Sequence, residues 1–149
     1  MKFIAHRGNI NEKKPEKENH PDYILEAMQL GYDVEVDVWY ENDKFVLGHN
    51  NPEYEIDYNF LLNQSLWCHA KNIEALYAMR ALKAHCFWHQ EDDVSLTSNG
   101  FLWTYPGKPL YGLSICVKPE LSQYSKNDLL SCYGICSDSI KSYRVKQNG

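Results

Sequence analysis

The sequence has no long apolar stretch. No segment approaches the roughly 20 consecutive apolar residues that a membrane-spanning helix needs, and residues 1–7 lack the apolar region of a signal peptide. We therefore expect a cytoplasmic protein without a membrane partner.

Positive charge is also scarce. The chain carries 15 Lys and Arg residues against 20 Asp and Glu residues, which gives a formal net charge of −5. A partner held through many phosphates, such as duplex DNA, requires a basic surface, so we expect no nucleic-acid partner. A small anionic ligand stays compatible with this balance, because a local site can be cationic inside an acidic protein.

Cysteines in a metal-binding or redox spacing are absent. The five cysteines are an odd number, include no Cys-x-x-Cys pair, and three of them lie inside apolar runs. This pattern predicts reduced, buried thiols rather than a disulfide framework or a zinc site. The residues concerned are Cys68, Cys86, Cys116, Cys132 and Cys136.

The composition supplies enough apolar material for one core. The 149 residues are 44% hydrophobic and 13% aromatic, which is typical of a single globular domain spanning residues 1–149. Strand and helix patterns alternate over the first part of the chain, which favours an α/β fold with mostly parallel strands. We expect strands at 2–5, 32–40, 44–48, 65–71, 84–89, 101–105, 113–117 and 133–137, helices at 22–30, 73–83, 125–131 and from 139, and no helix over 94–120.

Polar residues follow these expected strands. In parallel α/β folds, chemistry collects at the carboxyl ends of the strands, so side chains from several strands can converge there. The residues at those ends are His6 with Arg7, Glu35 with Asp37, His69 with Lys71, His89, and Asp138.

The pair Glu35-x-Asp37 alternates with valines. Both carboxylates therefore share one face of a strand, roughly 6.6 Å apart at about 3.3 Å per residue. That spacing lets them share a divalent cation. The alternative is an exposed acidic edge of the sheet. His69 and Lys71 have the same relationship, whereas His85, like His20, is expected to be structural.

Several of these residues, taken in order, resemble a known family. The motifs are His6-Arg7-Gly8, Glu18-Asn19, Glu35-x-Asp37, His49 and a strand ending in Lys71. They are similar to the glycerophosphodiester phosphodiesterase family, within the phosphatidylinositol phospholipase C-like superfamily. The resemblance is specific over residues 2–50 and extends through residue 72, and residues 133–138 look like the last strand of that family.

Three departures from the family pattern bear on the site. His49 is followed by Asn50 where the family has aspartate, and His69 stands where a third metal carboxylate is expected. The chain is also much shorter than the roughly 250 residues of an ordinary (β/α)8 barrel. The resemblance therefore implies a pruned or minimal (β/α) TIM-type barrel that has lost outer helices between residues 94 and 120.

The resemblance implies a metal site. Glu35, Asp37 and His69 would hold a divalent metal ion, which could be Mg²⁺, Mn²⁺ or Ca²⁺. A neutral imidazole in place of a carboxylate weakens the binding of a hard cation and favours Mn²⁺ or another borderline metal.

It also implies the catalytic groups. Arg7 and Lys71 would stabilise the charge that develops on the phosphoryl oxygens. His6 and His49 would exchange protons with the reacting oxygens, and the sequence leaves open which is the acid. The expected substrate contacts are Arg7, Glu18, Asn19, Lys71, His89 and Trp103. For His89 the alternative is packing, and for Trp103 it is a turn with a hydrophobic anchor.

The sequence thus predicts a metal-dependent phosphodiesterase that hydrolyses a small soluble phosphodiester of the glycerophosphodiester type. One alternative is a lyase that forms a cyclic phosphate through a neighbouring hydroxyl group of the substrate. Another is a noncatalytic protein that binds a phosphate ligand. A pruned barrel would expose apolar surface, so a homodimer is a further expectation.

Overall fold

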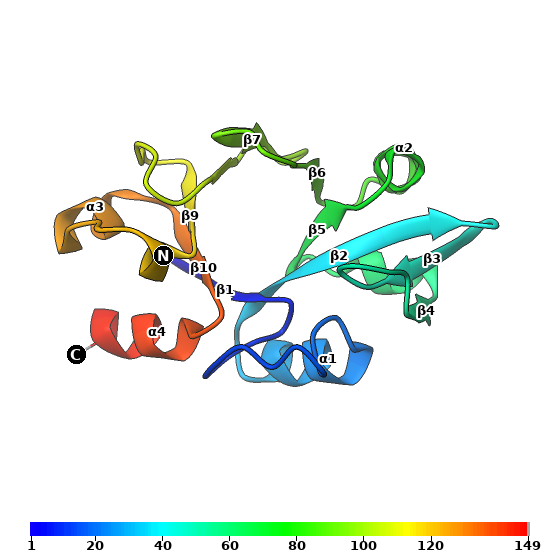
Figure 1. Ribbon diagram of the computed structural model, residues 1–149, viewed down its shortest axis with the longest axis horizontal. Coiled ribbons are helices and arrows are strands. Elements are labelled where there is room, and N and C mark those ends of the chain that lie inside the picture. Colours follow the sequence, from blue (N-terminus) through cyan, green and yellow to red (C-terminus); the bar gives the residue numbers. More distant parts are fainter. Residues whose placement is uncertain (149) are drawn as a thin grey trace.

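A computed structural model describes residues 1–148 as a curled sheet with helices on its outer side (Figure 1). The strands are β1 (Lys2–His6), β2 (Asp33–Glu41), β3 (Lys44–Leu47), β4 (Tyr54–Ile56), β5 (Leu66–Ala70), β6 (Cys86–Trp88), β7 (Val94–Leu96), β8 (Leu102–Thr104), β9 (Ser114–Val117) and β10 (Gly134–Ser137). The helices are α1 (Pro21–Gln29), α2 (Ile73–Leu82), α3 (Lys126–Ser131) and α4 (Ile140–Asn148), with short 3-10 turns η1 (Tyr58–Leu62) and η2 (Pro119–Leu121).

Around the sheet the strand order is β6-β5-β2-β1-β10-β9-β8-β7. Every neighbouring pair in this series is parallel except β8 and β7, which are antiparallel. The far end of β2 continues into an antiparallel extension made of β3 and β4. This is a mixed α/β fold with mostly parallel strand pairing, as expected.

The curl brings β7 back toward β6 (Figure 1). No strand ladder joins β6 and β7 within residues 1–148. Instead, Ser98 N–H donates to the Cys86 carbonyl over 2.8 Å, and Cys86 N–H donates to Ser98 Oγ over 2.9 Å. Ser98 therefore supplies the hydrogen bonds that a ladder would otherwise make at this point.

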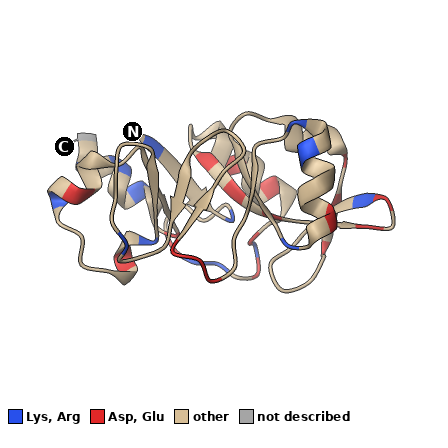
Figure 2. Cartoon of the chain, turned by 90° about the horizontal axis from the view of Figure 1, so that it is seen from above, with Lys and Arg blue, Asp and Glu red and all other residues tan. Residues whose placement is uncertain are grey.

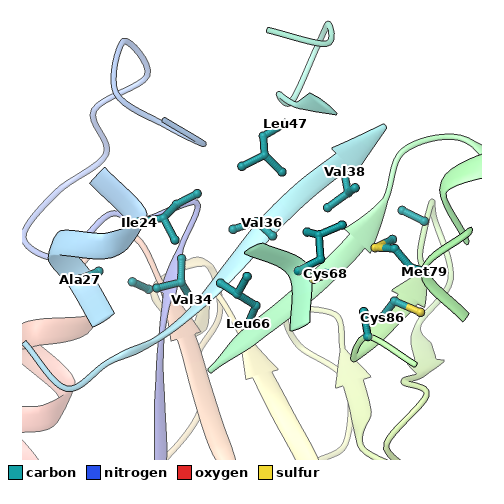
Figure 3. Close-up of a cluster of buried hydrophobic side chains, with 14 of the residues drawn as sticks. Ile24, Ala27, Val34, Val36, Val38, Leu47, Leu66, Cys68, Met79 and Cys86 are labelled. Carbon is teal, nitrogen blue, oxygen red and sulfur yellow. The ribbon is translucent and has the colours of Figure 1, made fainter. Parts of the chain in front are cut away.

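Strand alternation produces two apolar layers. Val34, Val36 and Val38 face outward and pack with helix residues such as Ile24 and Met79 (Figure 3). The opposite face of the strands forms a second cluster inside the curl, made of Ile4, Trp67, Phe87, Trp103, Ile115 and Cys136. The inward-pointing residues nearer the carboxyl ends of β1, β2 and β5 are polar, which places the site above this inner cluster.

The expected elements are confirmed apart from boundary shifts, and the structure adds β4, β7 and the 3-10 turns η1 and η2. No α-helix lies between residues 94 and 120, as expected, although the 3-10 turn η2 begins at Pro119 within this range. Glu35 and Asp37 are 2% and 0% exposed, so the alternative of an exposed acidic edge is wrong. All five cysteines are free and buried, as predicted.

Charged residues of both signs are interspersed along the chain (Figure 2). Within residues 1–148, none of the helices has the length and apolar character that crossing a bilayer requires.

Candidate functional site

The carboxyl ends of the parallel strands surround one pocket of about 360 Å³. Nine of the residues singled out in the sequence line it: His6, Arg7, Glu35, Asp37, His49, His69, Lys71, His89 and Trp103. The lining is completed by Gln90, Tyr105, Pro106, Val117, Lys118 and Leu121.

Strand register explains how these residues meet. In the parallel pairing of β1 with β2, His6 lies opposite Glu35. In the pairing of β2 with β5, Asp37 lies opposite His69. Side chains at paired positions point to the same side of a sheet, so the register alone sets two histidines beside two carboxylates.

His6 is held by Asp138, which follows β10. Nδ1 of His6 lies 2.7 Å from Oδ1 of Asp138, and the same oxygen accepts a hydrogen bond from Asn9 Nδ2 over 2.9 Å. Burial disfavours the charged ring and lowers the pKa of His6, although the hydrogen bond to Asp138 opposes this shift. His6 is therefore neutral near pH 7.

The tautomer of His6 follows from its partner. Burial opposes ionisation of Asp138, but the hydrogen bonds from His6 and Asn9 hold the pKa of that carboxyl below its usual value. A carboxylate only accepts hydrogen bonds, so the proton of His6 is on Nδ1. The lone pair of Nε2 then faces the pocket, where it lies 3.7 Å from Oε2 of Glu35.

Asp37 is the most heavily contacted carboxylate of the site. Its Oδ2 accepts a hydrogen bond from Asn19 Nδ2 over 2.9 Å and lies 3.2 Å from Arg7 Nε and 3.3 Å from His49 Nδ1. Its Oδ1 lies 3.1 Å from Nδ1 of His69. Burial alone would raise the pKa of Asp37, but the two neighbouring histidines and the charge of Arg7 hold it well below the usual range.

Glu18 and Asn19 position other residues of the site instead of lining this pocket. Glu18 accepts hydrogen bonds from Arg7 over 3.2 Å and from Asn9 over 2.7 Å. Asn19 uses both ends of its amide on Asp37, because its Oδ1 also accepts the Asp37 backbone N–H over 2.9 Å. Glu18 and Asn19, which the sequence predicts as substrate contacts, thus bind Arg7 and Asp37 in this structure.

Glu35 carries an unpartnered atom. Its Oε1 is buried and has no hydrogen-bond partner among the described residues. Burial raises the pKa of Glu35 well above its usual value and the charge of Asp37 adds to this, while Arg7 and Lys71 act in the opposite direction. An isolated buried carboxylate requires either a proton or a cation beside it.

Both ring nitrogens of His69 face oxygen atoms that accept hydrogen bonds. Its Nε2 lies 2.8 Å from the carbonyl oxygen of His89, and its Nδ1 faces Asp37 Oδ1. A neutral imidazole has one N–H and cannot donate to both oxygens. Glu35, Asp37 and His69 each offer an atom within 4.8 Å of the others, so they could hold a metal ion. A second ring proton would also satisfy His69, but a cation there would satisfy both Glu35 and His69, so the donor set fits a metal.

Lys71 is placed at the pocket by the ladder between β5 and β2, because its backbone N–H donates to the Val38 carbonyl over 2.8 Å. Among the described residues, no carboxylate oxygen lies within 4.0 Å of its ammonium group, since Lys71 takes part in none of the ion pairs. The lysine is thus available to an anionic ligand.

Aromatic rings form one wall of the pocket. The ring of His89 stacks on that of Tyr105, with centroids 5.1 Å apart and an interplanar angle of 18°. Trp103 packs on Phe87 in the inner cluster, with ring centroids 4.6 Å apart, which agrees with the alternative that Trp103 is a hydrophobic anchor. The same residue also lines the pocket. Tyr105, which is 45% exposed, is the aromatic residue at the rim.

Sequence reasoning gave no role to Asn9, Lys118 or Asp138. Asp138 was visible as a carboxylate at a strand end, and Asn9 directly follows the His6-Arg7-Gly8 motif. Lys118 lies within residues 94–120, where the sequence predicts only the short strands 101–105 and 113–117.

No protein-family model matches the sequence, and no match was found among curated proteins or among solved structures. Fold and site together define the protein as an α/β domain whose curled sheet carries a pocket rich in histidines, carboxylates and cations.

Proposed function

We propose that this protein is a metal-dependent phosphodiesterase that hydrolyses a small soluble phosphodiester of the glycerophosphodiester type. Its fold would be a pruned (β/α) TIM-type barrel, and the chain would be a short divergent member of the family that residues 2–50 resemble. The single observation that carries the proposal is that His6, Arg7, Glu35, Asp37 and His49, which match the motifs of that family in order, line one pocket.

The charges of the pocket suit a phosphodiester. Such a group carries one negative charge, and attack on phosphorus spreads further charge onto the nonbridging oxygens. Arg7 and Lys71 would bind these oxygens. A divalent cation held by Glu35, Asp37 and His69 would add positive charge at the same oxygens, and the imidazole of His69 favours Mn²⁺ over Mg²⁺ or Ca²⁺.

Proton transfer would be divided between the two histidines. His6 has its lone pair on Nε2, so it would accept the proton of the attacking water while the new P–O bond forms. His49 would give a proton to the alcohol oxygen as the other P–O bond breaks. Nε2 of His49 lies 3.2 Å from a terminal nitrogen of Arg7, which can only donate, so Nε2 is the acceptor in this structure. A phosphate that draws Arg7 toward itself would free Nε2 to take up a proton from solvent, and His49 would then give that proton to the alcohol oxygen.

A second candidate is a noncatalytic protein that binds a phosphate ligand. It is favoured by one observation, which is that Arg7, Asn19, His49 and His69 together contact both oxygens of Asp37, the oxygens that a metal ion would need. In this case Asn50 and His69, which depart from the family pattern, would mark lost catalysis.

Incubation with a panel of glycerophosphodiesters separates the candidates. Each substrate is tested with Mg²⁺, Mn²⁺, Ca²⁺ or a chelator, and products are identified by phosphorus NMR. A phosphomonoester indicates hydrolysis, whereas a cyclic phosphate indicates a lyase. His6→Ala should lower the rate by roughly 10² to 10⁴. Absence of turnover with every metal would favour the noncatalytic candidate.

A further inference from the structure

Lys118 is a cation of the pocket that none of the family motifs includes. It follows β9 directly, and its backbone N–H donates to the Cys136 carbonyl of β10 over 2.7 Å. This hydrogen bond continues the ladder between β9 and β10 and fixes the start of the Lys118 side chain at the edge of the pocket. Lys118 lines that pocket together with Arg7 and His49, and the same three residues also line an adjoining polar pocket.

The backbone of Lys118 has an unfavourable conformation. Its φ of 47° and ψ of 61° lie in the left-handed region, which is unfavourable for a residue with a side chain. The next residue is Pro119, which favours an extended conformation in the residue before it and so adds to the strain at Lys118. A residue held in such a conformation beside a pocket is typical of functional sites.

The ammonium group of Lys118 retains donor capacity. Its nearest carboxylate oxygen is Oδ2 of Asp138, at 3.6 Å, and among the described residues it forms no side-chain hydrogen bond. The other oxygen of Asp138 is engaged by His6 and Asn9. The Lys118 side chain is 24% exposed, so it is partly shielded from water and still accessible to a ligand.

Lys118 and Lys71 lie on opposite sides of Arg7 in the pocket. In the sheet, β9 and β5 lie two strands away from β1 on opposite sides. Lys118 and Lys71, which follow these strands, therefore flank Arg7, which follows β1. All three cations line the same pocket, so one phosphate bound there could accept charge-assisted hydrogen bonds from each of them.

We propose that Lys118 binds the phosphoryl group of the ligand, from the side of the pocket that holds His6 and Asp138. The assignment deepens the proposed function, because it names a specificity-determining contact to phosphate at the same site. It holds equally for a substrate and for a ligand that is bound without turnover.

Calorimetric titration with inorganic phosphate tests the assignment without relying on catalysis. The variants are Lys118→Asn and Lys118→Gly, both of which tolerate the left-handed backbone, and Lys118→Arg, which keeps the charge. The matched control is Lys83→Asn. Lys83 also has a left-handed backbone, with φ of 63°, but it is exposed and precedes β6 at the opposite end of the sheet.

Both neutral variants should bind phosphate on the order of tenfold more weakly than the wild-type protein, since a hydrogen bond to a charged group is lost. Lys118→Arg and Lys83→Asn should bind it like the wild type, and all variants should unfold at a similar temperature. Unchanged phosphate affinity in both neutral variants would overturn the assignment, as would a wild-type protein that binds no phosphate at millimolar concentration. Turnover of phosphodiesters is measured separately, and it tests the proposed function whatever the phosphate titration shows.

Discussion

Nδ1 of His6 lies 2.7 Å from Oδ1 of Asp138, although 132 residues separate the two in the chain. The contact exists because β1 and β10 are parallel neighbours, with Ala5 paired to Ser137. The first and last strands of the chain therefore place these two side chains side by side at their carboxyl ends. This pairing fixes which nitrogen of His6 faces the pocket.

Replacing Asp138, the acceptor of the hydrogen bond from His6, should impair the proposed phosphodiesterase activity. In Asp138→Asn the amide no longer holds the proton of His6 on Nδ1 as firmly, so we expect kcat for a phosphodiester to fall roughly 10²-fold or more, with a smaller change in KM. Asp43→Asn, in the turn between β2 and β3, is the control and should keep full activity. Equal activities of the two variants would contradict the role of Asp138.

Metal affinity should depend on Glu35 and not on His6. Glu35→Gln removes one of the two carboxylates proposed to bind the metal, so Mn²⁺ affinity in a calorimetric titration should fall at least about tenfold. His6→Ala should change it little, and Glu55→Gln, at an exposed position of β4, serves as a second control. In His69→Glu the preference should shift toward Mg²⁺ or Ca²⁺. Metal binding that is unchanged in both Glu35→Gln and His69→Glu would argue against this site.

Gly48 fixes the segment that carries His49. A Cβ atom on Gly48 would lie 1.9 Å from the carbonyl oxygen of Asn51. Gly48→Ala must therefore shift the backbone, and we expect a loss of about 2 kcal/mol in urea unfolding together with lower activity. The same change at Gly112, where a Cβ meets nothing within 4 Å, should be tolerated. A Gly48→Ala variant as stable and active as Gly112→Ala would refute this reading.

Acidification should destabilise the protein partly through His85. The ring is buried and bonded to Thr97 Oγ1 over 2.8 Å, and burial lowers the pKa of His85 to about 4. The unfolded chain, with an ordinary histidine pKa near 6.5, binds more protons between these values. The stabilising contribution is therefore complete above about pH 6.5 and is lost as the pH falls toward 4.

The measurement for this effect is the melting temperature of wild type and His85→Gln across that range. The variant lacks the titrating ring, so its melting temperature should decline less between pH 6.5 and 4.5. Parallel curves for the two proteins would show that His85 does not contribute.

The expected homodimer has a candidate surface on the outer side of β7 and β8. The connection between β8 and β9 contains no helix, and Leu96 is 69% exposed. If two copies pack through this face, light scattering should give twice the mass of one chain, and Leu96→Glu should halve it. A monomeric mass at micromolar concentrations contradicts the expectation.

The local pattern of apolar and polar residues was enough to predict most of the strands and helices. The alternation of Val34, Val36 and Val38 with Glu35 and Asp37 specifies both the strand and its two faces, so the inward carboxylates could be predicted before the structure. The helices also carry local signals, such as the capping box of Ser125 and Asp128 at the start of α3.

Partners that are distant in the chain could not be predicted in this way. The contact of Asp138 with His6 depends on which strands become neighbours, and that is decided by packing of the whole sheet. β7 was missed because Val94–Leu96 is too short to show a period of its own, and its pairing with β8 defines it. The roles of Glu18 and Asn19 as supports for Arg7 and Asp37 likewise emerge only from tertiary contacts.

The reversed direction of β7 has a consequence for how this protein could diversify. Because β7 runs against its neighbours, the connection from β6, residues 89–93, stays at the mouth of the pocket and needs no return helix. His89 and Gln90 of this connection line the pocket, whereas none of its residues belongs to a strand. Loops of different length or composition could therefore be exchanged here, and ligand preference would change while the frame that holds the acids, bases and cations stays the same.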